Sequence, residues 1–292
     1  INAVDKMTGT ANVYGVRIVR LFCDDKEIFS SDLTAFTFAQ TRMINSMTDF
    51  DYWYRHKSFY MKSFVEPGNK LPIYKAINNG YIKIDQEKVY KLRYELEDLY
   101  GNKRSYQFAI KGKRQDIPKQ RPCSQVMTWE YDNHYLTDDF KFVVPKGYLY
   151  TNIGFLLKSS ESKKHLSPIY SLHDSHVPLD GYCDMTIKMI KDTIVNKLQY
   201  GIVRVNGNSE SWIGGTYNDG KITAKVRELG HSYAVTYDNK APTITPVNPA
   251  RWVAQRKIVI RFSDNKSGVR SYKGTIDGEF VLFENDTKKP DY

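Results

Sequence analysis

One stretch of strict alternation between apolar and charged side chains constrains the fold of this chain more than any other feature. Between Val89 and Glu97 the apolar set is Tyr90, Leu92, Tyr94 and Leu96, and the charged set is Lys91, Arg93, Glu95 and Glu97. A period of two, with one face buried and one face wet, is typical of a strand in an antiparallel sheet. The alternation resumes at residues 106–110 after turn-forming residues at 98–102, so the stretch predicts a β-hairpin.

Shorter alternating runs recur along the whole chain and are separated by Gly, Pro, Asn and Asp. They occupy residues 16–23, 140–144, 222–226, 233–235, 258–262, 272–276 and 279–283. Aromatic residues make up 14% of the chain, led by 22 tyrosines, and such side chains favour pleated, half-buried surfaces. The sequence therefore predicts a mainly β protein of tandem immunoglobulin-like or related antiparallel β-sandwich domains. Residues 188–197 fit a short helix or a strand equally well.

Two polar, proline-containing segments, at residues 111–122 and 238–242, divide the chain into three regions. We expect residues 1–112 to form an immunoglobulin-like β-sandwich with a truncated N-terminus, residues 113–238 a second β-rich domain, and residues 239–292 the truncated start of a third immunoglobulin-like domain. The truncations are expected because the first residue is not Met, and because a seven-stranded sandwich needs roughly 100 residues.

The chain is basic, with 43 Lys and Arg against 33 Asp and Glu and a formal net charge of +10. Such a surface attracts polyanions, which include nucleic acids and anionic polymers of the cell envelope. The charges are scattered, and the densest run, at residues 111–121, is typical of a solvated linker. We therefore expect no nucleic-acid partner.

Cysteine spacing and hydropathy indicate whether the chain carries disulfide bonds and whether it crosses a membrane. Cys23, Cys123 and Cys183 lie far apart in the sequence, so a disulfide framework is not indicated, although one pair could still bridge. We expect all three to be free, with Cys23 sharing a strand face with Val19 and Leu21. No apolar run approaches 18 residues, and we expect no membrane-spanning helix.

The histidines offer one pattern that suits zinc. His176 and Asp180 stand in a His-x-x-x-Asp spacing, with His173 close by. A catalytic zinc needs a third protein ligand, no His-x-His is present, and Pro178 within the spacing favours a loop. The sequence also has no Gly-x-Ser-x-Gly elbow and no phosphate-binding glycine loop. The oxygens of Asp264, Asn265 and Ser267 fit a polar turn better than a calcium loop. We therefore predict neither catalytic nor metal-binding residues.

An aromatic segment of the first region is the predicted place for any ligand binding by this chain. The candidate ligand-binding residues are Tyr52, Trp53, Tyr54, Arg55 and Lys57, with His56 among them. Aromatic rings beside cationic groups suit a glycan or an acidic stem peptide. The competing interpretation is that these rings fill a core or a seam between domains.

Several long segments of the chain resemble one family in detail. The first set is AVDKMTGTANVYGV, TRMINSMTDFDYWY, FVEPGNKLP and YELEDLYGN. It is similar to the first module after the catalytic domain in lysostaphin/LytM-like zinc endopeptidases of Gram-negative, gut-dwelling bacteria. The segments LQYGIVRVNGNSESWIGGTY and RELGHSYAVTYDNKAPTITPV resemble the next module, and FSDNKSGVRSYKGTIDGEFVLFEND resembles the start of the last, immunoglobulin-like module.

The resemblance implies a parent protein that cleaves peptidoglycan peptides with a zinc ion. In that family His-x-x-x-Asp and His-x-His motifs hold the zinc upstream of these modules, so no cofactor is expected in this chain. We expect a non-catalytic accessory region that positions or restrains a catalytic domain absent from this chain. Its partners would be peptidoglycan, another envelope polymer or the parent's own catalytic domain. Its location would be the cell envelope, periplasmic or outer-membrane associated. The alternative is a stand-alone adhesion or glycan-binding array of immunoglobulin-like modules.

Overall fold

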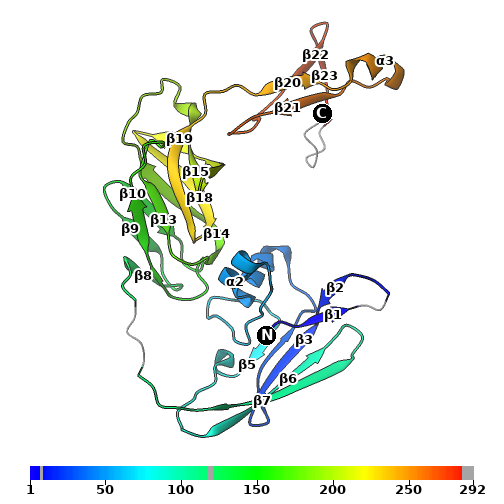
Figure 1. The fold of residues 1–292 in the computed structure, drawn as a ribbon, viewed down its shortest axis with the longest axis vertical. Helices are drawn as coiled ribbons and strands as arrows, with labels where there is room; N and C mark the ends of the chain where they lie inside the picture. The colour runs from blue at the N-terminus through cyan, green and yellow to red at the C-terminus, as the bar shows by residue number, and fades with distance from the viewer. Residues whose placement is uncertain (7–8, 117–120, 285–292) are drawn as a thin grey trace.

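The computed structural model describes residues 1–6, 9–116 and 121–284. Strands hold 44% of the residues and helices 11%. Every strand pairing in the described ranges is antiparallel, which confirms the predicted mainly β class. Figure 1 shows three groups of strands along the chain, coloured blue to blue-green, green to yellow, and orange to red. Residues 117–120, in the expected first linker, and residues 285–292 lie outside the described ranges.

The first group is a five-stranded sheet in the order β5-β4-β3-β6-β7. Its strands are β3 (Ile18–Cys23), β4 (Lys26–Asp32), β5 (Tyr74–Ala76), β6 (Val89–Glu97) and β7 (Lys103–Lys111). Two further strands, β1 (Val4–Lys6) and β2 (Val13–Gly15), pair with each other. In this sheet Cys23 lies opposite Leu92, and Leu21 lies opposite Tyr94, so the expected shared face of β3 is formed.

The predicted hairpin is confirmed as β6 and β7. Leu92 lies opposite Phe108 and Tyr94 lies opposite Tyr106, so the apolar residues of both strands share one face. Tyr90 and Leu92 are buried there, while Tyr94 is only half-buried. At the turn only Gly101 adopts a positive φ, of 87°, and the Asp98 carboxylate accepts hydrogen bonds from the backbone N–H groups of Tyr100 and Asn102.

The chain between β4 and β5 crosses the apolar face of this sheet. It contains η1 (Phe38–Met43), α1 (Ile44–Met47) and α2 (Phe50–His56), and a further short helix, η2 (Asn78–Gly80), follows β5. Met47, Leu71 and Ile73 form a small core within this layer. The hydroxyl of Ser63 lies 2.7 Å from that of Tyr94, which ties the layer to β6. The layer facing the sheet is thus made of loops and short helices, because residues 33–73 carry no alternating run.

The second group is a sandwich of two five-stranded sheets. One has the order β17-β18-β14-β10-β9 and the other β12-β13-β19-β15-β16, with β8 and β11 paired separately. The strands are β8 (Gln125–Met127), β9 (Asn133–Leu136), β10 (Phe140–Val144), β11 (Ile153–Phe155), β12 (Leu157–Ser160), β13 (Ile169–Leu172), β14 (Pro178–Lys188), β15 (Tyr200–Asn206), β16 (Ser209–Gly214), β17 (Thr216–Asn218), β18 (Lys221–Glu228) and β19 (His231–Tyr237).

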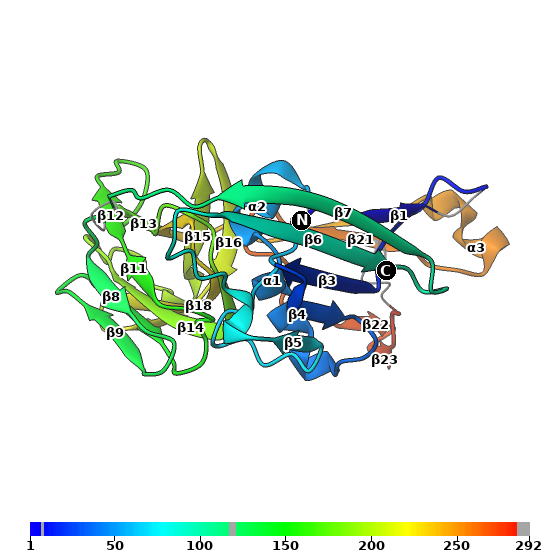
Figure 2. The same ribbon diagram turned by 90° about the horizontal axis from the view of Figure 1, so that it is seen from below.

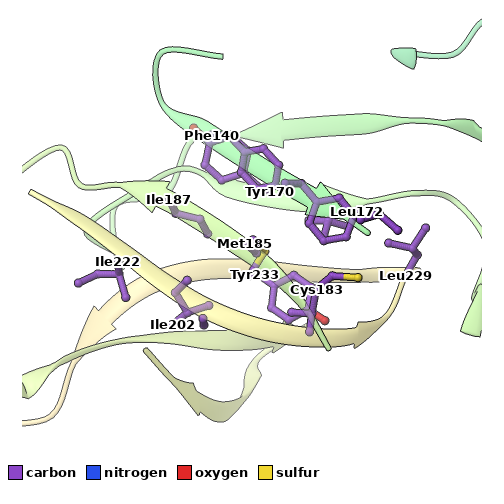
Figure 3. Close-up of a cluster of buried hydrophobic side chains, with 14 of the residues drawn as sticks. Phe140, Tyr170, Leu172, Cys183, Met185, Ile187, Ile202, Ile222, Leu229 and Tyr233 are labelled. Carbon is purple, nitrogen blue, oxygen red and sulfur yellow. The ribbon is translucent and has the colours of Figure 1, made fainter. Parts of the chain in front are cut away.

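The largest cluster of buried apolar side chains in the described ranges sits between these two sheets. Met185 and Ile222 from one sheet and Leu172, Ile202 and Tyr233 from the other are among its buried side chains, as Figure 3 shows. The alternating residues predicted at 140–144 and 222–226 point into this core, which accounts for their pattern. Burial of these apolar side chains is the main source of stability for the sandwich.

Residues 188–197 form neither of the two elements that their sequence favoured. Strand β14 ends at Lys188, and the only helix nearby is η3 (Lys197–Gln199). The intervening loop is held by side chains: the Asp192 carboxylate accepts hydrogen bonds from the hydroxyls of Tyr200 (2.9 Å) and Tyr217 (2.7 Å). A carboxylate that bonds to two strands in this way favours a loop over either regular element.

The C-terminal strands form two small, separate pairs. Strand β20 (Thr243–Pro246) pairs with β21 (Ile260–Ser263), and β22 (Gly274–Ile276) pairs with β23 (Glu279–Val281); η4 (Pro249–Arg251) and α3 (Trp252–Gln255) lie between the first two. The predicted Asp-Gly turn is present, with φ of 50° at Asp277 and 86° at Gly278. None of the side chains described from residue 241 to 284 is fully buried, so these strands share no core with each other.

The three thiols are free: that of Cys183 is buried, that of Cys23 half-buried and that of Cys123 exposed. Across the described ranges, no helix is long and apolar enough to cross a membrane.

Candidate functional site

Helix α2 carries most of the residues predicted to bind a ligand. Asp49 caps its N-terminus, and its carboxylate accepts a hydrogen bond from the backbone N–H of Tyr52 (3.1 Å). The helix ends at His56 because Lys57 adopts the left-handed conformation, with φ of 55°. A helix directs neighbouring side chains to different sides, so the predicted residues do not share one surface.

Tyr54 and Arg55 face the second group of strands. The ring of Tyr54 stacks on that of His176, with centroids 3.8 Å apart, and meets the ring of His231 edge-on at 5.1 Å. Arg55 pairs with Asp51 of its own helix (Nε to Oδ2, 2.9 Å) and donates a hydrogen bond to the backbone carbonyl of Asp174 (3.1 Å). These two predicted site residues therefore belong to a seam between regions, as the competing interpretation had it.

Asp51 is the polar centre of this seam. Its Oδ1 accepts hydrogen bonds from the backbone N–H of His176 (2.7 Å) and from Nδ1 of the same residue (2.8 Å). Burial would raise the pKa of the Asp51 carboxyl, but the hydrogen bonds from His176 and Arg55 outweigh burial and lower it. The carboxylate thus stays charged and holds the imidazole in place beneath the ring of Tyr54.

Two backbone contacts extend the seam. The guanidinium of Arg42 donates to the carbonyls of Leu179 (2.9 Å) and Arg227 (2.6 Å), and the N–H of Gly68 donates to the carbonyl of Tyr150 (2.8 Å). We call the contacts of Arg42, Asp51, Tyr54, Arg55 and Gly68 with the second group of strands the junction. Sequence reasoning missed Arg42, Asp51 and Gly68, because each one taken alone has the sequence context of an ordinary surface or turn residue.

The opposite side of α2 and the loop after it expose a cluster of rings. Tyr52 is 39% exposed, Phe59 59% and Tyr60 41%, while Trp53 is half-buried. Tyr52 packs edge-on against Tyr60 at 4.9 Å, Trp53 lies 5.8 Å from Phe59, and Nζ of Lys57 lies 5.0 Å from the Trp53 ring. We call this cluster the ring surface and define it as Tyr52, Trp53, His56, Lys57, Phe59 and Tyr60.

Three of the predicted ligand-binding residues, Tyr52, Trp53 and Lys57, lie on the ring surface. Phe59 and Tyr60 were not predicted as site residues, although they follow the helix directly and their aromatic character marks them. His56 lies 4.3 Å from Tyr52, one helical turn away. The ring surface can stack against apolar faces of a ligand and attract its anionic groups.

The histidine and carboxylate that suggested zinc are engaged elsewhere. Nδ1 of His176 is bonded to Asp51, and the Asp180 carboxylate accepts a hydrogen bond from the hydroxyl of Tyr150 (2.7 Å). Likewise, Oδ1 of Asp264 accepts from the backbone N–H groups of Lys266 and Gly268, as a polar turn requires. Within residues 1–6, 9–116 and 121–284 no three His, Cys, Asp or Glu side chains are grouped so that they could hold a metal ion.

Comparison with known proteins bears on the second group of strands. Residues 124–238 are similar to a Zu5-like domain. The matched stretch contains every strand from β8 to β19, so we call it the Zu5-like region. No curated protein and no solved structure matches the chain. The likeness concerns the region on which α2 docks and leaves the ring surface outside it.

Proposed function

We propose that this chain is the non-catalytic accessory region of a cell-envelope peptidoglycan peptidase and that it holds the ring surface against peptidoglycan. In this role it positions or restrains the parent's catalytic domain, which carries the zinc and performs the cleavage. The resemblance of segments in all three regions to the accessory modules of zinc endopeptidases supports the assignment. No catalytic residue and no metal ligand is assigned to this chain.

The observation that carries the proposal is the exposure of Tyr52, Phe59 and Tyr60 beside Lys57. Large rings that remain outside a core expose apolar area that a ligand can cover. Sugar rings of a glycan strand offer apolar faces to such rings, and Lys57 can pair with a carboxylate of a stem peptide. The net charge of +10 favours the approach of an anionic polymer.

Sedimentation with purified, insoluble peptidoglycan tests the proposal. We expect the chain to sediment with it, and we expect a Tyr52→Ala, Tyr60→Ala double variant to bind at least about tenfold more weakly, since ring stacking is lost at two positions. Trp53→Ala should weaken binding too, once near-ultraviolet circular dichroism has shown that this half-buried ring is not needed for folding. Tyr131→Ala is the matched control, because Tyr131 is 69% exposed on the Zu5-like region.

Equal binding by the double variant and by Tyr131→Ala would reject the ring surface as the binding site. The stand-alone glycan-binding array would use the same ring surface, so a second measurement is needed to separate the two functions. The reading frame upstream of Ile1 provides it: His-x-x-x-Asp and His-x-His motifs there support the peptidase parent. A signal peptide running directly into Ile1 would support the array instead.

A further inference from the structure

Strand β7 forms one open edge of the first sheet. The strand order ends with β6-β7, and Figure 2 shows β7 along the outside of that sheet. β7 is nine residues long and contains no proline. Among the residues that the structure describes, its backbone pairs with β6 alone. An edge of this length presents a row of unpaired N–H and C=O groups to solvent.

The register identifies which groups point outward. At the two ends of the hairpin, the N–H of Asp98 donates to the carbonyl of Asn102 (3.1 Å), and the N–H of Gly112 donates to that of Lys88 (2.9 Å). Hydrogen-bonded and non-hydrogen-bonded pairs alternate in an antiparallel ladder, so the even-numbered residues of β7 bond to β6. The odd-numbered residues therefore direct their backbone groups to the open edge; they are Lys103, Ser105, Gln107, Ala109 and Lys111.

One face of this edge is apolar and only partly covered. Tyr106 is 67% exposed, and its neighbours Phe108 and Ile110 are half-buried. The ring of Phe108 stacks with that of Tyr94 (centroids 6.2 Å apart) and lies 5.9 Å from that of Tyr106. A strand added beside β7 would cover these three side chains with its own apolar residues.

The charges along β7 favour one kind of added partner strand. Lys103, Arg104 and Lys111 are exposed, and β7 has no acidic residue. Of these three cationic residues only Lys103 has an acidic partner within the described part of the chain, namely Glu97 at 3.7 Å. If two copies of β7 paired with Gln107 at the centre, Lys103 of each would lie opposite Lys111 of the other. Like charges in such positions disfavour self-pairing and favour a segment with acidic ends.

We propose that the edge of β7 binds an extended acidic peptide segment of another protein chain as an additional antiparallel strand. The backbone of Ser105, Gln107 and Ala109 supplies the hydrogen bonds. Tyr106 and Phe108 receive alternate apolar side chains, and Lys103 and Lys111 pair with acidic residues at the two ends. This site is separate from the ring surface and does not depend on the proposed function.

The test uses the full chain and a synthetic peptide as long as β7, with alternating Val and Thr between two terminal Asp residues. Amide NMR should show shifts and slowed exchange at Ser105, Gln107 and Ala109. The same peptide with Lys at both ends should bind at least about tenfold more weakly. So should an Asp-ended peptide methylated on the alternate backbone nitrogens that face β7, because its donors are removed without any change to the protein.

A pair of variants tests the same edge from the protein side. Gln107→Pro removes an outward N–H and leaves the ladder to β6 intact, whereas Gln107→Thr keeps that N–H. We expect at least about tenfold weaker binding for the proline variant and little change for the threonine variant. The proposal is overturned by equal binding of the Asp-ended and Lys-ended peptides, by unchanged binding of the methylated peptide, or by no response of these amides at about 1 mM peptide.

Discussion

The phenol ring of Tyr54 lies nearly flat on the imidazole ring of His176, with centroids 3.8 Å apart and planes 17° apart. Tyr54 belongs to helix α2 over the first sheet, and His176 belongs to the Zu5-like region. Asp51, one turn earlier on the same helix, bonds to the same imidazole. One short helix thus docks the two regions through Asp51 and Tyr54 and exposes the rings of Tyr52 and Trp53, while Lys57 contacts both sides, with its Nζ 4.6 Å from the ring of Tyr54.

The junction is expected to weaken in acid. Burial lowers the pKa of His176 more than its hydrogen bond to Asp51 raises it, and the charge of His231 lowers it further. Because the pKa of His176 is lower in the docked state than in the undocked state, protonation of its imidazole favours the undocked state. The docked state therefore loses stability as pH falls below about 6.5. The pKa of Asp51 is also lowered, so the stabilisation of the docked state by its carboxylate is lost only below about pH 4. Small-angle scattering should give a larger radius of gyration at about pH 5 than at about pH 7.5.

His176→Phe is the control for this pH dependence. The phenyl ring keeps the stack on Tyr54, and the backbone N–H of residue 176 still donates to Asp51. The radius of gyration should then be the same at both pH values. A response that persists in this variant would assign the titration to another group, and His173, whose pKa is also lowered by burial, is the candidate in the same segment.

Gly68→Ala should open the junction without touching any charged group. A Cβ at this position would lie 2.7 Å from the carbonyl oxygen of Leu149 and 2.8 Å from Cα of Tyr150, and backbone atoms cannot move aside cheaply. We expect a cost of about 1–3 kcal/mol, from thermal unfolding. Gly15→Ala is the matched control because a Cβ at that position would have no atom within 4 Å, and it should change stability by no more than about 0.5 kcal/mol. Equal costs would mean that the two regions do not dock through Gly68.

Leu92→Ala and Lys91→Ala should differ sharply, although they are neighbours on β6. Leu92 is 5% exposed and faces the covered side of the sheet, so its truncation should cost about 2–5 kcal/mol. Lys91 is exposed on the other face, and its truncation should stay within about 0.5 kcal/mol. Urea unfolding followed by tyrosine and tryptophan fluorescence measures both. Similar values for the two variants would contradict the assignment of the faces.

Residues 243–284 should exchange their amide protons earlier than the rest of the described chain. Their strands have no fully buried side chain, and Ile244 and Phe280 are 66% and 65% exposed. Few buried apolar contacts mean a low free energy of local opening. Hydrogen exchange followed by mass spectrometry should show early exchange after Pro242 and slow exchange in β6. Equal protection of the two segments would show that the C-terminal strands have support beyond the contacts described above.

The elements that the sequence predicted well are those whose pattern lies within one strand or one turn. Alternation alone placed β6 and β7, and Asp277 and Gly278 alone placed the turn between β22 and β23. Helix α2 was not predicted, because its aromatic residues favour strands by composition, although Asp49 is a good N-cap. The junction could not be predicted, because Asp51 and His176 are 125 positions apart and no repeating pattern links them.

Residues 112–124 connect β7 to β8, so the two regions that meet at the junction are also joined by a short stretch of chain. A tether of this length keeps each region near the other at an effective concentration in the millimolar range. Docking of the two tethered regions therefore needs only weak contacts. The same contacts would not hold two free proteins together at about micromolar concentration. One proteolytic cut in this stretch would turn an intramolecular equilibrium into a bimolecular one, so docking of the two pieces would then depend on the protein concentration.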